Sequence, residues 1–430
     1  MSLADQASLL LIPSGYKSQK VYSIFPTDGD GDFDFSRSGS ATRIAKNGLI
    51  TTVDSNIPRL EYPMIDGVQK GCPSLILEGA RTNLITNSED LSSGFFNENT
   101  SELLNVIISP DGTLNADKLV ENNTNGRHEL YSGTISFSGT TSISFFAKAE
   151  ERRYISVFFG GNPGNGGATF DVEDGVVSLT SGGTDASIVN YGNGWYRCSL
   201  TSTVAATNRI YYCLRTDASA VSVQVYQGDG TSGMYLWGFQ TEVGQSYPTS
   251  YIKTNGNIVT RNAETCNGAG DSTIFNDSEG VLMAEISALA DDLTFRVFGL
   301  SNGSTSNRIV FYYSSTSNNI QLLITAGGVV QSQLSIIANI KTFKKIAIKY
   351  KLNDVTLWVN GFELKTDTSA TMPSGLNELA FDAGNGADKF YGKTKQLQYY
   401  NSALTDSELE QLTSWTSFTD MAEGQLYTIE

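Results

Sequence analysis

The chain has 430 residues, and its 29 Lys and Arg against 45 Asp and Glu give a formal net charge of −16. At about 150 residues per domain, this length predicts about three domains. Because a bound polyanion would add like charge to an acidic surface, the charge argues against nucleic acid as a partner. No apolar run approaches the roughly 20 residues of a membrane-spanning helix, so we expect no membrane insertion.

Composition favours an all-β protein. Only 17% of the residues are charged, against about 25% in an average soluble domain, so long solvated helices are not expected. The 42 Gly against only 9 Pro suggest many tight turns and few rigid linkers, and the 20 Tyr and 21 Phe can fill several hydrophobic cores. The start of the chain carries no basic and apolar leader, and we expect synthesis in a reducing cytoplasm.

Residues 1–85 are irregular, with short apolar runs scattered among turns. We expect this N-terminal region to lack a core of its own and to pack against another part of the protein. An Asp-Gly repeat at residues 28–32 has the spacing that opens a calcium-binding EF-hand loop. Phe33 and Gly39 stand where such a loop needs Gly and Glu, so a solvated turn before a strand is the favoured interpretation.

Residues 86–262 contain repeated runs of strand-forming residues with turns between them and no helical periodicity. In one run, Val221, Val223 and Val225 alternate with polar residues, which predicts a strand with one buried face. The other runs are residues 142–147, 154–159, 194–201, 209–214 and 234–239. This series predicts an antiparallel β-sandwich, most simply a jelly roll.

A second series of strands in residues 263–415 predicts another antiparallel sandwich. Asn-Gly at residues 360–361, between two alternating runs, predicts a hairpin with a type I′ turn. Thr405 and Glu408 have the spacing of a capping box, which predicts one short helix with its leucines facing inward. Residues 416–430 carry little pattern and are expected to form a tail.

The four cysteines, Cys72, Cys198, Cys213 and Cys266, are far apart, and with a single histidine the chain has no metal-ligand spacing. We expect buried thiols, with a Cys198–Cys213 bridge between neighbouring strands as the alternative. His128 has no nucleophile near it in the sequence, and we expect it to be exposed to water in a loop.

Three stretches resemble known families. The N-terminal region resembles that of a family of tailed-bacteriophage virion proteins in residues 12–17 (IPSGYK), 33–43 (FDFSRSGSATR), 56–60 (NIPRL) and 72–84 (CPSLILEGARTNL). The middle region is similar to the carbohydrate-binding-module-like jelly roll of those proteins in residues 194–197 (GWYR), 240–252 (QTEVGQSYPTSYI) and 259–262 (VTRN). The last region resembles a concanavalin or laminin-G-like lectin sandwich in residues 358–361 (WVNG), 392–398 (GKTKQLQ) and 403–409 (ALTDSEL).

The resemblance implies a structural component of a phage particle, either a tail fibre or spike or a head fibre, made in the host bacterial cytoplasm. It implies contacts with other virion proteins through the N-terminal region, and homo-oligomers that are trimers by analogy with fibres. Host-surface glycan is the implied ligand. The expected organisation is residues 1–85 as a virion-anchoring or oligomerisation region, 86–262 as the jelly roll, 263–415 as the lectin-like sandwich and 416–430 as the tail.

Three functions are open at this point: non-enzymatic glycan attachment, a capsular polysaccharide depolymerase, and a purely architectural subunit. Concanavalin-like hydrolases place their carboxylates at alternate positions of one strand. Glu285 fits such a strand, but Ser287 and Leu289 follow it, and the adjacent Asp291 and Asp292 would point to opposite faces. We therefore expect no catalytic residues and no enzyme activity.

Glycan binding needs aromatic faces for the C–H surfaces of sugars and fixed polar groups for their hydroxyls. The candidate platforms are Tyr154, Phe158, Tyr235, Tyr312 and Tyr313, although core packing is the commoner role of aromatic residues in sandwiches.

The loop at residues 382–388 offers Asp382, Asn385 and Asp388 as oxygen ligands for Ca²⁺. A Gly-rich turn without an ion is the favoured interpretation of this loop, and no other cofactor is expected.

Overall fold

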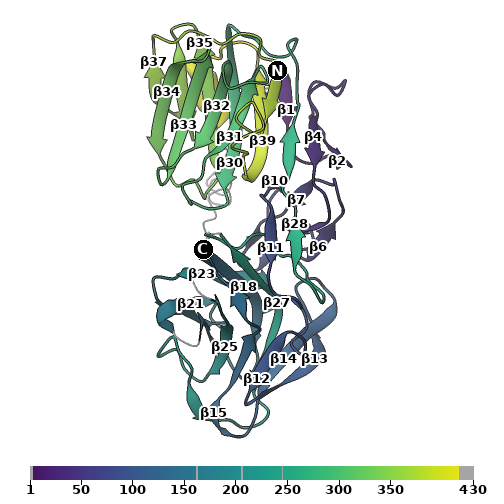
Figure 1. The fold of residues 1–430 in the computed structure, drawn as a ribbon. Coiled ribbons are helices and arrows are strands. Elements are labelled where there is room, and N and C mark those ends of the chain that lie inside the picture. The colour runs from purple at the N-terminus through teal and green to yellow at the C-terminus, as the bar shows by residue number, and fades with distance from the viewer. Residues whose placement is uncertain (1–2, 161–162, 205–206, 245, 416–430) are drawn as a thin grey trace.

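A computed structural model describes residues 3–160, 163–204, 207–244 and 246–415. The protein is built from antiparallel strands, with one sandwich at the top of Figure 1, another at the bottom, and the N-terminal strands along one side. The all-β prediction with two sandwiches and one short α-helix is confirmed for the residues that the structure describes. No helix within these ranges is long and apolar enough to cross a bilayer.

The jelly roll consists of two six-stranded sheets. The β19 sheet contains, in spatial order, β12 (Phe95–Glu98), β16 (Glu129–Ser132), β25 (Ile210–Arg215), β19 (Tyr154–Phe159), β20 (Gly167–Asp171) and β21 (Val176–Ser181). The β18 sheet contains β13 (Thr100–Ile108), β14 (Leu114–Glu121), β27 (Gly233–Val243), β18 (Gly139–Ala149), β23 (Trp195–Val204) and β22 (Asp185–Gly192). Alternate residues of each strand, such as Ile155, Val157 and Phe159, fill the core between the sheets.

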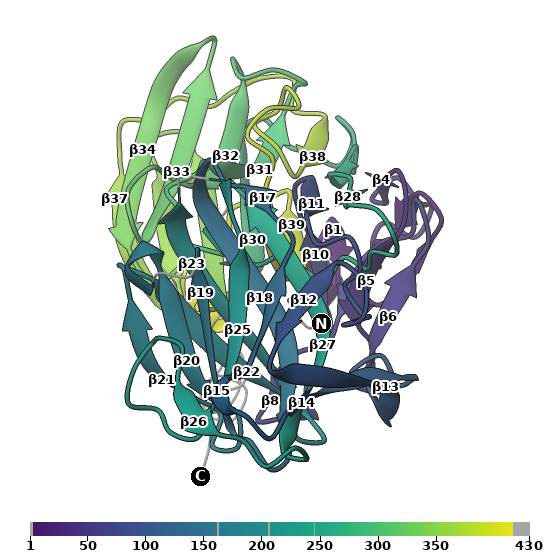
Figure 2. The ribbon, with the colours of Figure 1, turned by 60° about the horizontal axis from the view of Figure 1, so that its bottom comes forward.

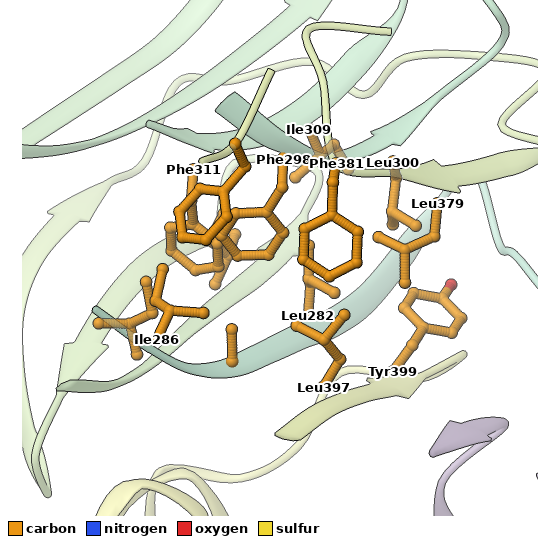
Figure 3. Packing of buried hydrophobic residues seen from close by; sticks show 14 of the residues in the cluster. Leu282, Ile286, Phe298, Leu300, Ile309, Phe311, Leu379, Phe381, Leu397 and Tyr399 are labelled. Atoms are coloured by element: carbon orange, nitrogen blue, oxygen red, sulfur yellow. The ribbon is translucent and has the colours of Figure 1, made fainter. Parts of the chain in front are cut away.

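The second sandwich packs a five-stranded sheet on an eight-stranded sheet. The β32 sheet contains β34 (Val329–Ile337), β33 (Asn319–Ala326), β32 (Arg308–Tyr313), β31 (Arg296–Ser301) and β38 (Glu378–Ala380). The β39 sheet contains β37 (Phe362–Asp367), β36 (Val355–Val359), β35 (Lys344–Lys351), β30 (Glu279–Ala288), β39 (Gly392–Tyr400), β10 (Ser74–Leu77) and β7 (Arg59–Glu61), with β1 (Leu9–Leu11) also on β39. Leu282, Phe298, Phe311 and Phe381 interdigitate between the two sheets (Figure 3).

The N-terminal strands are part of this second sandwich. β1 and β10 pair with successive stretches of β39, and β4 (Phe33–Ser36) pairs with β29 (Thr265–Asn267). Residues 9–77 and 265–400 therefore share sheets, which differs from the expected division into separate regions at 1–85 and 263–415. The short apolar runs of the N-terminal region find their missing core here, because Leu9, Leu11 and Phe33 are buried with the C-terminal residues.

A two-stranded ribbon joins the jelly roll to the rest of the protein. The chain enters the jelly roll through β11 (Arg81–Asn83) and leaves it through β28 (Val259–Arg261), and these strands pair antiparallel in the middle of Figure 1. The jelly roll is thus an insertion into the second sandwich.

The remaining elements are short. They are η1 (Ala4–Gln6), β2 (Tyr16–Lys17), β3 (Lys20–Val21), β5 (Ala41–Ile44), β6 (Ile50–Val53), β8 (Met64–Ile65), β9 (Val68–Gln69), β15 (Asn125–Arg127), β17 (Ile135–Ser136), η2 (Pro163–Asn165), β24 (Thr207–Asn208), β26 (Val225–Gln227) and α1 (Asp406–Thr413).

A buried charge network lies where the ribbon meets the second sandwich. Glu264 binds Arg37 at 2.8 Å and Arg59 at 2.5 Å, and Glu78 binds Arg59 at 2.9 Å and Arg261 at 2.8 Å. All five side chains are at most 2% exposed. Buried charges persist only when they are paired, so the N-terminal region and the segment that follows the jelly roll hold each other in place.

Two local predictions are confirmed in detail. Asn360 and Gly361, with φ of 50° and 89°, join β36 to β37, which is the positive-φ pair of a type I′ turn. In α1, the Thr405 hydroxyl accepts from the backbone N–H of Glu408, and the Glu408 carboxylate accepts from the backbone N–H of Thr405. The leucines of this helix pack onto the β39 sheet, as expected.

The predicted strand at residues 221–225 is wrong. Only β26 forms there, and Val225 is 65% exposed. The preceding loop, residues 216–224, folds over the outer face of the β19 sheet, where the carbonyl of Ala220 accepts a hydrogen bond from Thr169 Oγ1 at 2.9 Å. Hydrogen bonds to the sheet surface have replaced the strand pairing that alternation suggested.

His128 and three of the four cysteines are buried, so the prediction for His128 is wrong and that for the cysteines holds for all but Cys72. His128 is buried rather than exposed, because it packs against Tyr226 with a ring-centroid distance of 4.4 Å. All four cysteines are free thiols, and the alternative bridge is wrong because Cys198 lies in the β18 sheet and Cys213 in the β19 sheet. Cys72 is exposed, whereas burial raises the pKa of the other three thiols.

A candidate glycan-binding face on the jelly roll

Four aromatic side chains form a ladder across the outer face of the β19 sheet. Phe96, Tyr131, Tyr211 and Phe158 lie opposite one another on the neighbouring strands β12, β16, β25 and β19. Successive ring centroids are 5.6, 5.4 and 5.7 Å apart, with interplanar angles of 16°, 32° and 7°. Direct cross-strand register brings these rings together although they are far apart in the sequence.

A cation lies on the open end of this aromatic ladder. The guanidinium of Arg209 is 5.1 Å from the centroid of the Tyr131 ring and 5.8 Å from that of Phe96. Arg209 is exposed and forms no ion pair with any described carboxylate. Its donors are therefore free to bind a hydroxyl or carboxylate of a ligand that contacts the rings.

Exposure decreases along the ladder. Phe96 is 51% exposed, Tyr131 and Tyr211 are half-buried, and Phe158 is fully buried. The loop at residues 216–224 covers the sheet beyond Phe158, as the hydrogen bond to Ala220 shows. The three rings at the β12 side, with Arg209, make up the accessible surface.

A polar row follows the ladder two residues further along the strands. Arg127 binds Glu98 through three hydrogen bonds of 3.1, 2.8 and 2.9 Å at the exposed end. Glu129, opposite Glu98, is buried and accepts a hydrogen bond from the Cys213 thiol at 3.4 Å. Burial raises the pKa of the Glu129 carboxyl. The candidate face therefore joins an apolar stripe to a charged border, which is the pairing of surfaces that sugars require.

Of the predicted platforms, Phe158 alone belongs to the ladder. Tyr154 is on the same strand and face, but its ring is covered by the Arg153 guanidinium at 5.1 Å. Tyr235 lies in the other sheet of the jelly roll, with Lys118 Nζ 5.9 Å from its ring centroid. These positions do not form one surface with the ladder.

The two candidates in the second sandwich are also separate from it and from each other. Tyr312 is half-buried on the outer face of the β32 sheet, and its hydroxyl is bound by Gln321 and Gln333. The prediction of Tyr313 as a platform is wrong. Its side chain is 2% exposed in the core between the sheets and cannot present its ring to a glycan.

The predicted calcium ligands form a turn. Both carboxylate oxygens of Asp382 accept hydrogen bonds, at 2.9 Å from Asn267 Nδ2 and at 2.7 Å from the backbone N–H of Gly384. Asn385 Oδ1 accepts from the backbone N–H of Ala387 at 3.1 Å, and Asp388 is exposed. Within the described residues, no cluster of three or more His, Cys, Asp or Glu side chains could hold a metal ion.

Glu285, Asp291 and Asp292, the carboxylates considered for hydrolysis, each have different protein partners. Glu285 is buried and accepts a hydrogen bond from Gln396 Nε2 at 2.8 Å. Asp291 accepts from the backbone N–H of Asn318 at 3.0 Å, and Asp292 forms an ion pair with Arg296 at 2.7 Å. Each is engaged in a structural hydrogen bond or ion pair.

The sequence carries a signal for the ladder in addition to the predicted isolated platforms. Phe95-Phe96, Tyr211-Tyr212 and Phe158-Phe159 are adjacent aromatic pairs in strands. Because successive side chains point to opposite faces, one ring of each pair must lie outside the core. Which outer rings meet depends on register, which the sequence does not display.

Comparison with known proteins gives structural neighbours only. No family model and no curated protein matches the chain. The CBM40 domain of a Ruminococcus gnavus IT-sialidase, in a complex with α2,3-sialyllactose, is 19% identical over 34% of this chain and 88% of its own, with a TM-score of 0.30. A SAP-like pentraxin from Limulus polyphemus is 12% identical over 33% of this chain and 71% of its own, with a TM-score of 0.27. Domains LG4–5 of the mouse laminin α1 chain are 8% identical over 79% of this chain and 96% of their own, with a TM-score of 0.22. Scores this low assign no function.

Proposed function

We propose that this protein is a non-enzymatic glycan-binding display protein, and that the open end of the aromatic ladder is its binding surface. The observation that supports the proposal is the arrangement of Phe96, Tyr131 and Tyr211 with the unpaired Arg209. Cross-strand aromatic packing alone would stabilise the sheet. Stabilisation of the sheet would not require the exposed Phe96 ring at the end of the ladder or the Arg209 guanidinium above it.

The motif resemblance supports the further proposal that the protein carries out this binding on a bacteriophage particle. In that setting the protein is a fibre or spike subunit that binds host-surface glycan, with homo-oligomers multiplying weak single-site affinity. The N-terminal strands are integrated into the second sandwich, so a contact with other virion proteins would use the outer surface of that sandwich. Labelling the protein in assembled particles by electron microscopy tests the virion location directly.

A glycan array tests the binding activity. We expect the wild-type protein to bind surface polysaccharides and the Tyr211→Ala and Phe96→Ala variants to bind about tenfold more weakly, since each removes a ring contact. Tyr312→Ala, which alters a half-buried tyrosine on the other sandwich, is the matched control and should bind normally. An array that stays blank for the wild-type protein would favour the architectural alternative, and release of reducing ends would favour a depolymerase.

A further inference from the structure

A cleft of about 430 Å³ lies where the N-terminal strands, the jelly roll and the second sandwich meet. Its walls include Arg43 and Glu61 from the N-terminal region, Tyr191 and Arg197 from the jelly roll, and Lys341 and Lys393 from the second sandwich. This volume is within the range of roughly 300–1,000 Å³ that is typical of small-molecule sites. The cleft is on the β18 sheet side and is distinct from the aromatic ladder on the β19 sheet.

Charged groups from all three parts converge around Tyr191. Lys393 Nζ and Glu61 Oε1 form an ion pair at 2.8 Å that joins the second sandwich to the N-terminal region. Burial raises the pKa of the Tyr191 hydroxyl, and the nearby Arg197 partly opposes this rise. Burial also opposes ionisation of Lys393, but Glu61 outweighs it and raises the lysine pKa. The tyrosine stays protonated and the lysine stays charged at neutral pH.

The cleft is basic although the protein is strongly acidic. Among the described residues that line it, five basic side chains face two carboxylates, an excess of three positive charges. Arg43, Arg197 and Lys341 form no ion pair with any described carboxylate. Nε of Arg43 and Nε of Arg197 are buried without a hydrogen-bond partner, whereas Nη2 of Arg197 donates to Ser144 Oγ at 2.9 Å and to the carbonyl of Thr249 at 2.7 Å. A chain with a net charge of −16 has acidic groups to spare, so unpaired cations collected in one cavity point to an anionic ligand.

The rest of the lining suits a sugar ring better than a bare inorganic anion. Tyr62, Tyr247 and Phe343 add aromatic surface to the walls. Burial raises the pKa of Tyr247 to about 12, so its hydroxyl remains a hydrogen-bond donor. Glu61 offers carboxylate oxygens that can accept hydrogen bonds from sugar hydroxyls. Phosphate would use the cations alone.

From these groups we infer that the junction cleft binds a carboxylate-bearing sugar, with Arg43, Arg197 and Lys341 around the carboxylate and the aromatic walls against the ring. This site is independent of the ladder and does not require the function proposed for it. Its occupant would contact all three parts of the protein at once.

Calorimetric titration of the full chain at low ionic strength tests the inference. The probes are glucuronate, galacturonate and N-acetylneuraminate, with glucose and inorganic phosphate as comparisons. We expect at least one acidic sugar to bind with a Kd below about 10 mM, and glucose and phosphate to bind at least about tenfold more weakly. Equal binding of phosphate or glucose, or no binding of any acidic sugar, would overturn the inference.

Variants separate the cleft from the ladder. Lys341→Glu and Arg43→Gln should each weaken acidic-sugar binding about tenfold, the loss of one charge-assisted hydrogen bond. Lys365→Glu makes the same charge change at an exposed position of β37 and should leave the Kd within about twofold. Tyr211→Ala should also leave it unchanged. Unaltered affinity in both cleft variants contradicts the inference, whatever the glycan array shows for the ladder.

Discussion

Arg59 and Glu264 are 205 positions apart and form a bidentate ion pair, at 2.8 and 2.5 Å, with neither side chain exposed to solvent. One partner precedes the inserted jelly roll and the other follows it. The pair therefore closes the base of the ribbon from both sides, and the same carboxylate also holds Arg37.

Removing the shared carboxylate should destabilise the protein strongly. Glu264→Gln leaves the buried Arg37 guanidinium without its counter-charge and Arg59 with Glu78 as its remaining partner, and we expect a loss of about 3–5 kcal/mol in the free energy of unfolding. Chemical denaturation followed by tryptophan fluorescence measures it. Asp34→Asn is the control, because its ion pair with Lys20 is largely exposed and should contribute at most about 1 kcal/mol. Equal effects of the two substitutions would contradict a structural role for the buried network.

The same network should make the protein sensitive to acid. Burial tends to raise the pKa of Glu78, but Arg261, Arg59 and Ser250 outweigh burial and hold it well below its usual value of 4.5. A carboxyl with a lowered folded-state pKa stabilises the protein above its unfolded-state pKa and loses that contribution as the pH falls. Wild-type protein should therefore exceed Glu78→Gln in stability at pH 7, and the gap should shrink below about pH 4.5. Urea midpoints of both proteins between pH 7 and 3 provide the comparison, and a constant gap would refute the assignment.

The two ends of the aromatic ladder should respond differently to truncation. Phe158→Ala removes a fully buried ring, and we expect it to destabilise the protein by about 3–5 kcal/mol. Phe96→Ala removes a half-exposed ring and should change stability by less than about 1.5 kcal/mol while weakening glycan binding. Thermal unfolding of both variants distinguishes them. A large stability loss for Phe96→Ala would mean that this ring serves the fold rather than a ligand.

Thiol reactivity should identify one cysteine. Cys72 is exposed, while burial raises the pKa of Cys198, Cys213 and Cys266 and keeps them protonated. A colourimetric thiol reagent should therefore modify one cysteine in the native protein and all four after unfolding. Cys72→Ser should abolish the native reaction, and a remaining fast thiol would show that a buried strand opens readily.

Calcium should not stabilise the loop at residues 382–388. Hydrogen bonds already occupy both carboxylate oxygens of Asp382, so an ion would have to displace Asn267 and the N–H of Gly384. We expect the melting temperature to be the same with calcium and with a chelator. A calcium-dependent rise that Asp388→Asn removes would establish a site there.

The sequence predicts a structural feature correctly where that feature depends only on residues close together in the chain. The turn at Asn360 and the cap at Thr405 are local, so the pattern alone predicted their geometry. The strand predicted at residues 221–225 does not form, because alternation shows which face of a strand could be buried and does not show whether a partner strand is present. His128 was misplaced because its contact with Tyr226 joins segments that the sequence does not connect.

The candidate site required information of another kind. The ladder depends on the register of four strands, and Tyr131 meets Tyr211 only because β16 pairs with β25 at that position. Arg209 then acquires its role from the rings beneath it. The cleft at Tyr191 depends on the packing of three parts of the chain, and no spacing of residues along one strand would reveal it.

The pairing of β1 with β39 sets an order of events during synthesis. Leu9 is paired with Tyr399, so the first strand leaves the ribosome long before its partner exists. The jelly roll, whose strands are all contiguous in sequence, can fold while that partner is still being translated. Its closure at the ribbon then brings the early and late strands to the same place and shortens the loop that β1 must close. We therefore expect early folding of the inserted domain to favour assembly of the sandwich that surrounds it.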